Sequence, residues 1–274
     1  WYKDGKINIY HNCVEKHLPH FNDKCAIKYL DKHGTLRELT YHELFLKVEH
    51  FSIFLKNKIS KKGKVKVAIH SSAFIEDAIA MLACCKLGIL FTVIFQTLPA
   101  KSILTRLKIF NPNLLITKSD IPEIKEKILP IIKNLNNVQN IKIRIVNFEC
   151  KNKIRTNYSY DMRKSLNKKD VIEKIPTRTL ASDKSSFVLF TSGSTGNPKG
   201  VEHTTGGYIL YSKLTCIDQF GMDKNSNVLT LSDAGWINGH TYALFGPLSL
   251  GATTLLVEDP MMMFNSILLE NVLK

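Results

Sequence analysis

The sequence predicts an α/β protein built on doubly wound, mostly parallel β-sheets. Between residues 65 and 147, short apolar runs of strand length alternate with segments of helix length, which is the pattern of a parallel sheet whose strands are joined by crossover helices. Each crossover has about the length of one helix. The same alternation returns at residue 185. We therefore expect two stacked βα subdomains, a division that a chain of 274 residues permits.

Residues 1–148 are expected to form an N-terminal arm and the first βα subdomain. The pattern predicts a helix around residues 13–18 and a β-hairpin whose strands, 26–30 and 37–40, flank a turn at 32–34. A helix over residues 41–58 follows, because its apolar residues recur at helical spacing. The alternating block then has strands at 65–70, 89–95, 114–117 and 141–147, and helices at 74–87, 101–110 and 122–136.

Residues 149–184 are rich in lysine and arginine and poor in apolar residues. This composition indicates a basic surface connector between the two subdomains. Residues 185–274 are expected to form the second subdomain, in incomplete form. Its expected elements are strands at 187–190, 228–231 and 253–257, helices at 207–220 and 240–250, and a further helix near residue 273.

The net charge of +14 comes mainly from lysine, because only six of the 38 basic residues are arginine. A basic chain is a candidate nucleic-acid binder, and the connector offers Tyr158 and Tyr160 for stacking on bases. However, nucleic-acid contacts favour the bidentate side chain of arginine. We therefore favour lysines spread over solvated surfaces, with no nucleic-acid partner.

The sequence shows no sign of a membrane protein or a secreted protein. No apolar run reaches the ~18 residues that cross a bilayer, and no signal-peptide pattern opens the chain. The cysteines show no Cys-x-x-Cys spacing, and no metal site is predicted. Cys84 and Cys85 fall within an apolar predicted helix, which is typical of reduced, buried thiols in a cytoplasmic protein. Because the chain begins at Trp1 and not at Met, further residues are expected before it.

Residues 191–200 read Thr-Ser-Gly-Ser-Thr-Gly-Asn-Pro-Lys-Gly and follow the apolar run at 187–190. Glycines let a ligand approach the backbone closely, hydroxyls donate and accept hydrogen bonds, and Lys199 adds a cation. The combination predicts an anion site that suits a polyphosphate. It is not a Walker A element, because Pro198 precedes Lys199, Gly200 follows it, and residues 201–204 are expected to be extended. A flexible Gly/Ser turn is the alternative.

This loop resembles the phosphate-binding signature of the AMP-forming adenylating enzymes, the acyl-CoA synthetase superfamily. The motifs that follow it resemble the acetyl-CoA synthetases in particular: residues 203–208, Asp233-Ala234-Gly235-Trp236, Gly239-His240, 246–248 and 251–254, together with residues 1–2 and 12–18. The resemblance covers nearly the whole chain. Because enzymes of this family are considerably longer, it implies a truncated N-terminal domain that is not expected to complete turnover alone.

The resemblance implies an AMP-forming ligase that joins acetate, or another short-chain acid, to CoA. A carboxylate attacks the α-phosphate of ATP, and the thiol of CoA then attacks the acyl-adenylate, so ATP, Mg²⁺ and CoA are implied. Lys199 is the implied catalytic residue, because it would offset the charge of the departing pyrophosphate. The implied contacts to the β- and γ-phosphates are Thr191, Ser192, Gly193, Ser194, Thr195, Gly196 and Lys199.

The implied contacts to the acyl group and the path of CoA are Trp236, Ile237, Asn238, Gly239 and His240. The simpler alternatives are that Trp236 is a core aromatic residue and that His240 is hydrogen-bonded to backbone near a helix N-terminus.

This sequence departs from the family mainly where CoA is bound. Asn238 stands in place of a threonine, Gln96-Thr97 in place of two glycines, residues 122–127 in place of a segment with an arginine pair, and residues 260–265 in place of a Pro-Asn-Trp-Pro turn. A truncated, inactive remnant with at most weak nucleotide binding is therefore the second hypothesis. Downstream adenylation motifs in the same reading frame would favour the enzyme. Nucleic-acid binding ranks third, and the oligomeric state is not predicted.

Overall fold

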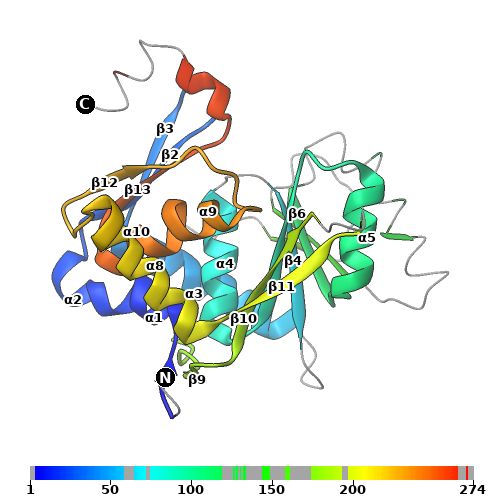
Figure 1. Cartoon of the computed structure of the whole chain (residues 1–274), viewed down its shortest axis with the longest axis horizontal. Helices are drawn as coiled ribbons and strands as arrows, with labels where there is room; N and C mark the ends of the chain where they lie inside the picture. Colours follow the sequence, from blue (N-terminus) through cyan, green and yellow to red (C-terminus); the bar gives the residue numbers. More distant parts are fainter. Residues whose placement is uncertain are drawn as a thin grey trace.

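Three β-sheets with helices packed against both faces of the largest one make up the described part of the chain (Figure 1). The computed structural model describes residues 4–58, 65–71, 75–118, 126, 128, 130, 132–133, 144–148, 158–160, 174–192, 197–264 and 270. This architecture confirms the predicted α/β fold class with mostly parallel pairing.

The largest sheet has seven strands in the order β11-β10-β5-β4-β6-β7-β8, and every neighbouring pair is parallel except β10 with β11. The chain leaves β4 for β5 on one side and then returns to pair β6 on the other side of β4, which is the arrangement of a doubly wound sheet. The strands are β4 (Lys66–Ser71), β5 (Leu90–Phe95), β6 (Leu114–Lys118), β7 (Arg144–Phe148), β8 (Tyr158–Tyr160), β10 (Ser185–Thr191) and β11 (Lys199–Thr204).

Two smaller sheets join distant parts of the chain. One has the order β12-β13-β2-β3, and the other pairs β1 with β9. The seven-stranded and the four-stranded sheets therefore each combine strands from before and after residues 149–184, and the division at that connector stays a prediction. The strands are β1 (Lys6–Ile7), β2 (Cys25–Leu30), β3 (Leu36–Thr40), β9 (Leu180–Ala181), β12 (Asn227–Leu229) and β13 (Thr253–Val257).

Side-chain alternation along the strands of the large sheet separates two hydrophobic clusters. On β4, Val67 and Ile69 belong to the main core, whereas Ala68 belongs to a second cluster with α5 (Ala100–Phe110). On β10, Phe187 belongs to the main core and Val188 to the second cluster. This period of two is what strand geometry requires when both faces of a sheet are covered.

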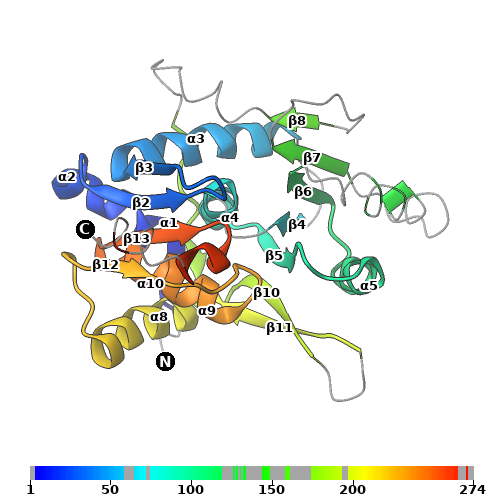
Figure 2. The ribbon, with the colours of Figure 1, turned by 90° about the horizontal axis from the view of Figure 1, so that it is seen from above.

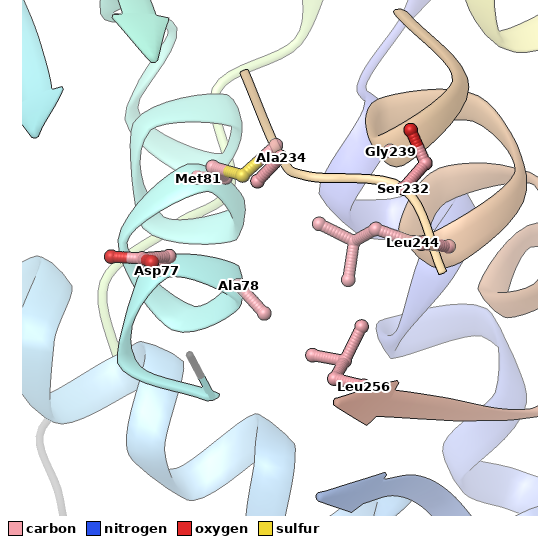
Figure 3. Close-up of a pocket in the computed structure, with 9 residues that line it drawn as sticks. Asp77, Ala78, Met81, Ser232, Ala234, Gly239, Leu244 and Leu256 are labelled. Carbon is pink, nitrogen blue, oxygen red and sulfur yellow. The ribbon is translucent and has the colours of Figure 1, made fainter. Parts of the chain in front are cut away.

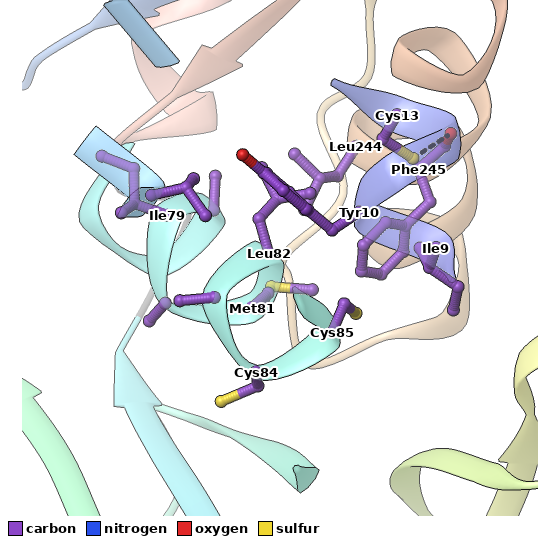
Figure 4. Packing of buried hydrophobic residues seen from close by; sticks show 14 of the residues in the cluster. Ile9, Tyr10, Cys13, Ile79, Met81, Leu82, Cys84, Cys85, Leu244 and Phe245 are labelled. Atoms are coloured by element: carbon purple, nitrogen blue, oxygen red, sulfur yellow. Dashed lines mark hydrogen bonds between the residues drawn. The ribbon is translucent and has the colours of Figure 1, made fainter. Parts of the chain in front are cut away.

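Helix α4 (Ile75–Leu87) lies at the centre of the main core and is buried on nearly all sides. Its buried residues are mostly apolar, with Glu76, Asp77 and Lys86 as the charged exceptions, and such a helix is typical of a protein interior. Figure 4 shows α1 (Ile9–Cys13) packed between α4 and the segment that carries Leu244 and Phe245. The thiol of Cys13 donates a hydrogen bond to the carbonyl of Phe245 over 3.5 Å, so the first helix is tied to residues far along the chain.

The remaining helices agree with the predictions in position more closely than in length. The predicted helix over 41–58 is α3 (Tyr41–Lys58). The predicted helix over 207–220 starts earlier, because the amide and hydroxyl of Thr205 both donate to the carbonyl of Lys184. The helices of these regions are η1 (Glu15–His17), α2 (Leu18–Phe21), α8 (Thr205–Phe220), α9 (Ile237–His240), the π-helical η3 (Thr241–Phe245), α10 (Gly246–Leu250) and η4 (Pro260–Phe264).

Some predictions fall outside the described residues. They include most of the predicted helix over 122–136 and the helix near residue 273. Within the connector, β8 and β9 are strands that the sequence did not predict. The predicted burial of Cys84 and Cys85 is confirmed. Among the described residues, no helix combines the length and the apolar character needed to span a membrane.

Segment 174–178 is anchored to the body through a buried ionic cluster. The ammonium of Lys86 lies 2.6 Å from a carboxylate oxygen of Glu49, and both side chains are 1% exposed. The same ammonium donates to the hydroxyl of Thr177 at 2.9 Å, and Thr177 in turn donates to Glu15 at 2.6 Å. Two buried charges thus satisfy each other and fix the segment that leads into β9 and β10.

Candidate active site

The β10–β11 hairpin carries the predicted phosphate loop, and it projects away from the body of the molecule (Figure 2). Thr191 ends β10 and Lys199 begins β11, and these two residues are directly paired across the hairpin. Thr191, Ser192 and Lys199 are all exposed. The other predicted phosphate contacts, Gly193, Ser194, Thr195 and Gly196, lie outside the described residues.

Close cross-strand packing explains why a glycine follows Lys199. Gly200 pairs with Phe190, and a Cβ atom at Gly200 would lie 3.0 Å from Val188 Cγ1 and 3.4 Å from the ring of Phe190. The residues after the loop are extended, as the sequence predicts, and form an antiparallel strand. This distinguishes the hairpin from a Walker A loop, which leads into a helix.

The carboxyl end of β5 lies beside the hairpin. Phe187 and Val188 of β10 are paired in parallel with Phe91 and Thr92 of β5. Beyond these pairs both strands continue in the same direction, β10 to Thr191 and β5 to Phe95. Because the carboxyl ends of parallel strands are where α/β sheets bind ligands, this edge is the candidate active site.

Trp236 lies over this edge. Its ring centroid is 5.2 Å from that of Phe95, and the side chain is 61% exposed. The alternative that Trp236 is a core aromatic residue is therefore wrong. An exposed indole supported on one side by another ring is suited to form one wall of a ligand site.

Ile237, Asn238 and Gly239 continue from Trp236 in the first turn of α9. The side chains of Ile237 and Asn238 are exposed, whereas Gly239 is buried. Behind them, a small, largely apolar cavity of about 20 Å³, partly open to solvent, lies between α4 and this segment (Figure 3). Its lining includes Asp77, Ala78, Met81, Ala234, Gly239 and Leu244.

His240 points into an aromatic cluster and not toward solvent. Its side chain is fully buried, and its ring lies 4.7 Å from Phe187 and 6.1 Å from Phe91, centroid to centroid. Neither ring nitrogen has a hydrogen bond of normal geometry within the described part of the chain. Burial lowers the pKa of His240 to about 3, partly opposed by the backbone of Trp236 and Ala234. His240 therefore packs behind the site as a neutral imidazole.

Acidification is expected to destabilise the fold through His240. An unfolded histidine titrates near ~6.5, whereas burial lowers the pKa of His240 to about 3 in the folded chain. The stabilisation is thus complete above the unfolded pKa and is lost as the pH falls toward the folded pKa, by up to about 1.4 kcal/mol per pH unit. Urea unfolding at several pH values from neutral to mildly acidic measures this slope. His240→Phe should show a shallower slope than the parent chain, and equal slopes would rule out this role.

Gly239 is a position where a side chain has no room. A Cβ atom there would lie 2.1 Å from the carbonyl oxygen of Asp233. Gly239→Ala should therefore displace the segment around Trp236 and lower the free energy of unfolding by about 1–3 kcal/mol. Gly207→Ala is the matched control, because a Cβ atom at Gly207 meets only the hydroxyl of Thr204 at 3.0 Å. Urea titration of both variants checks the difference, and equal stability of the two would contradict the account.

Two contributors to this site were not predicted from the sequence. Phe95 supports Trp236, and Asp233 shapes the turn before it. Usable signals were the position of Phe95 at the end of a predicted strand and the place of Asp233 in the motif that ends at Trp236. The structure brings Thr191, Lys199 and Trp236 to one edge of the sheet, with His240 buried behind them.

Nearly the whole chain matches known proteins. The sequence profile of a family described as AMP-binding enzyme matches residues 14–274. The chain is 36% identical over 269 residues to the acetyl-coenzyme A synthetase of Escherichia coli (strain K12). It is 34% identical over 263 residues to that of Bradyrhizobium sp. (strain ORS 278). In both comparisons the matched region covers 94% of this chain and 40% of the relative.

The fold of the chain also resembles that of a solved structure. The structure of acetoacetyl-CoA synthetase from Streptomyces lividans superposes with a TM-score of 0.79 at 17% sequence identity, over 92% of this chain and 38% of that one. The chain thus spans about two fifths of the length of the relatives it matches. Because the family profile matches residues 14–274, nearly the whole chain, the chain belongs to the AMP-binding enzyme family.

Proposed function

We propose that this chain carries the phosphate loop and part of the acyl pocket of an AMP-forming ligase, which activates acetate or a similarly short acid with ATP and transfers it to CoA. The observation that supports this most strongly is the meeting of two motifs at one sheet edge. The hairpin of Thr191 and Lys199 continues from β10, the strand that pairs with β5, and Trp236 lies against Phe95 at the end of β5. A ligand at that edge could touch both.

The first half-reaction needs stabilisation of negative charge on the departing pyrophosphate. The carboxylate oxygen of the acid attacks the α-phosphorus of ATP, and the bond to the β-phosphate oxygen breaks. In this proposal Lys199 offsets the charge on the β- and γ-phosphates, while Thr191, Ser192 and residues 193–196 donate hydrogen bonds. The described members fit such a group, because Thr191, Ser192 and Lys199 are exposed at the strand ends. Bound Mg²⁺ would add charge neutralisation at the same phosphates.

The second group of residues would receive the acid. Trp236 presents its face at the sheet edge, and Ile237 and Asn238 are exposed beside it. Gly239 and His240 are buried, so their proposed part is to shape the pocket from behind and not to touch the reacting atoms. The choice of acetate is supported by the names of the relatives, which are acetyl-coenzyme A synthetases at 34–36% identity.

Transfer to CoA is the finer part of the proposal. Asn238 and Gln96-Thr97 differ from the residues expected of acetyl-CoA synthetases near the path of CoA. Gln96 and Thr97 directly follow β5 and lie in the turn after Phe95. The altered residues are thus at the same strand end as Trp236, where they would affect access of the CoA thiol to the acyl-adenylate.

Trapping of the activated acid tests the proposal. The chain, and the longest product of its reading frame, are incubated with ATP, Mg²⁺, hydroxylamine and acetate, propionate or butyrate in turn. Formation of the hydroxamate with a short acid, together with AMP, is the expected result in the longer product. CoA in place of hydroxylamine then tests thioester formation separately. If the folded, longer product forms no hydroxamate and no AMP with any of these acids, the proposal fails.

A further inference from the structure

Three residues of the segment 232–239 lie close to Asp233, one at its side chain and two at its backbone carbonyl. The amide of Gly235 donates a hydrogen bond to Oδ1 of Asp233 over 2.7 Å, and the amide of Trp236 donates to the Asp233 carbonyl over 3.0 Å. Gly239 presses its α-carbon against that same carbonyl, since an added Cβ atom would lie 2.1 Å from the oxygen. Three residues of the loop thus take their positions from Asp233.

The loop also packs directly on Phe95. A Cβ atom at Gly235 would lie 1.7 Å from a ring carbon of Phe95, so the Gly235 backbone is in direct contact with that ring. The ring of Trp236 lies 5.2 Å from Phe95, tilted by 32°. Consequently, a change in the Gly235 backbone would move Trp236 relative to Phe95.

The Asp233 side chain is held within the structure and not by solvent. Burial raises the pKa of its carboxyl group, partly opposed by the hydrogen bond from Gly235. A partly desolvated acceptor that receives a short hydrogen bond fixes backbone geometry more tightly than an exposed one, because water competes less for the donor.

We propose that Asp233 is a positioning residue of the candidate active site, which holds Trp236 against Phe95 at the sheet edge by accepting the Gly235 amide. It touches neither the phosphates nor the acid in this arrangement. The proposal rests on the proposed function only for the role of Trp236 as a wall of the acyl pocket. The positioning itself is a property of the chain that can be measured without substrate.

The side-chain oxygen, and not the charge, carries this role. Asp233→Asn keeps an acceptor oxygen at the same place, whereas Asp233→Ala removes it. If the hydrogen bond positions the loop, asparagine should rescue what alanine loses. If Asp233 contributed only to overall stability, Asp233→Ala would leave the environment of Trp236 unchanged in the folded chain.

Tryptophan fluorescence gives a direct readout, because the chain has two tryptophans, Trp1 and Trp236. Trp1→Phe leaves Trp236 as the single reporter. In that background we compare emission wavelength and acrylamide quenching for the parent, Asp233→Ala, Asp233→Asn and Phe95→Ala, the last of which sets the values for an unsupported indole. Asp223→Ala is the matched control, because Asp223 caps a similar turn, with Oδ1 accepting the Asn225 amide at 2.8 Å.

The expected result is that Asp233→Ala shifts the emission to longer wavelength and raises the quenching constant to the Phe95→Ala value. Asp233→Asn and Asp223→Ala should keep the parent values. Measurements are made below the urea concentration at which any variant begins to unfold, so that a variant with lower stability is still read in its folded state. Parent-like fluorescence in folded Asp233→Ala overturns the proposal. Fluorescence of Asp233→Asn that differs from the parent also overturns the proposal. Neither result bears on hydroxamate formation, so the two proposals fail separately.

Discussion

Lys199→Ala should lower the rate of acid-dependent ATP use by about ten- to a hundredfold. A charge-assisted hydrogen bond contributes about 1.5–3 kcal/mol, and no other residue of the described hairpin carries a cation at the loop. Lys199 is exposed and begins β11 as the partner of Thr191, so the substitution removes charge without opening a cavity. Initial rates of pyrophosphate release at varied ATP concentration measure the effect.

Lys224→Ala is the control for loss of a lysine. Lys224 is exposed in the turn that precedes β12, a strand of the four-stranded sheet and not of the sheet that holds β10 and β5. It should keep the parent rate. If Lys199→Ala keeps the parent rate as well, the hairpin does not bind the phosphates.

Lys86→Ala should give the largest loss of stability, about 3–5 kcal/mol of the free energy of unfolding, because removing one partner leaves a buried charge unpaired. The charge left behind is Glu49, whose carboxylate lies 2.6 Å from the Lys86 ammonium, with both side chains 1% exposed. Thr177 also loses its ammonium contact. Urea denaturation followed by circular dichroism measures the change.

Two controls separate this effect from a general cost of losing a lysine. Lys28 pairs with Glu38 at 3.3 Å on the surface, with side chains 32% and 53% exposed, so Lys28→Ala should cost no more than about 1 kcal/mol. The double variant Lys86→Met, Glu49→Leu removes both buried charges and should regain most of the lost stability. A small loss in Lys86→Ala, or a double variant no more stable than the single one, would show that the pair is not effectively buried.

The strands at the site were predictable because their signals are local. Phe187 and its neighbours form an apolar run of strand length, and the Gly- and Ser-rich loop after it can only be a turn or a binding loop. The extended residues after Lys199 were also expected, because the Gly-Lys-Ser/Thr sequence that leads into the helix of a Walker A loop is absent there. Both predicted extended segments, 187–190 and 201–204, fall within the observed strands β10 and β11.

The geometry around Trp236 was not predictable, because distant residues determine it. The start of α9 at Ile237 has no helix signal, since Gly239 is a poor helix former; it is required there by contact with the Asp233 carbonyl. The exposure of Trp236 depends on Phe95, which is far away in sequence. Likewise, the pairing of β13 with β2 joins strands from opposite ends of the chain, which composition and periodicity do not reveal.

The most direct test of the proposed chemistry is acetate-dependent exchange of labelled pyrophosphate into ATP, measured on the chain and on the longest product of its reading frame, each with Lys199→Ala beside it. We expect exchange in the longer product that requires acetate and is lowered by about ten- to a hundredfold in the variant. No exchange in a folded longer product, or exchange that Lys199→Ala leaves unchanged, would contradict it.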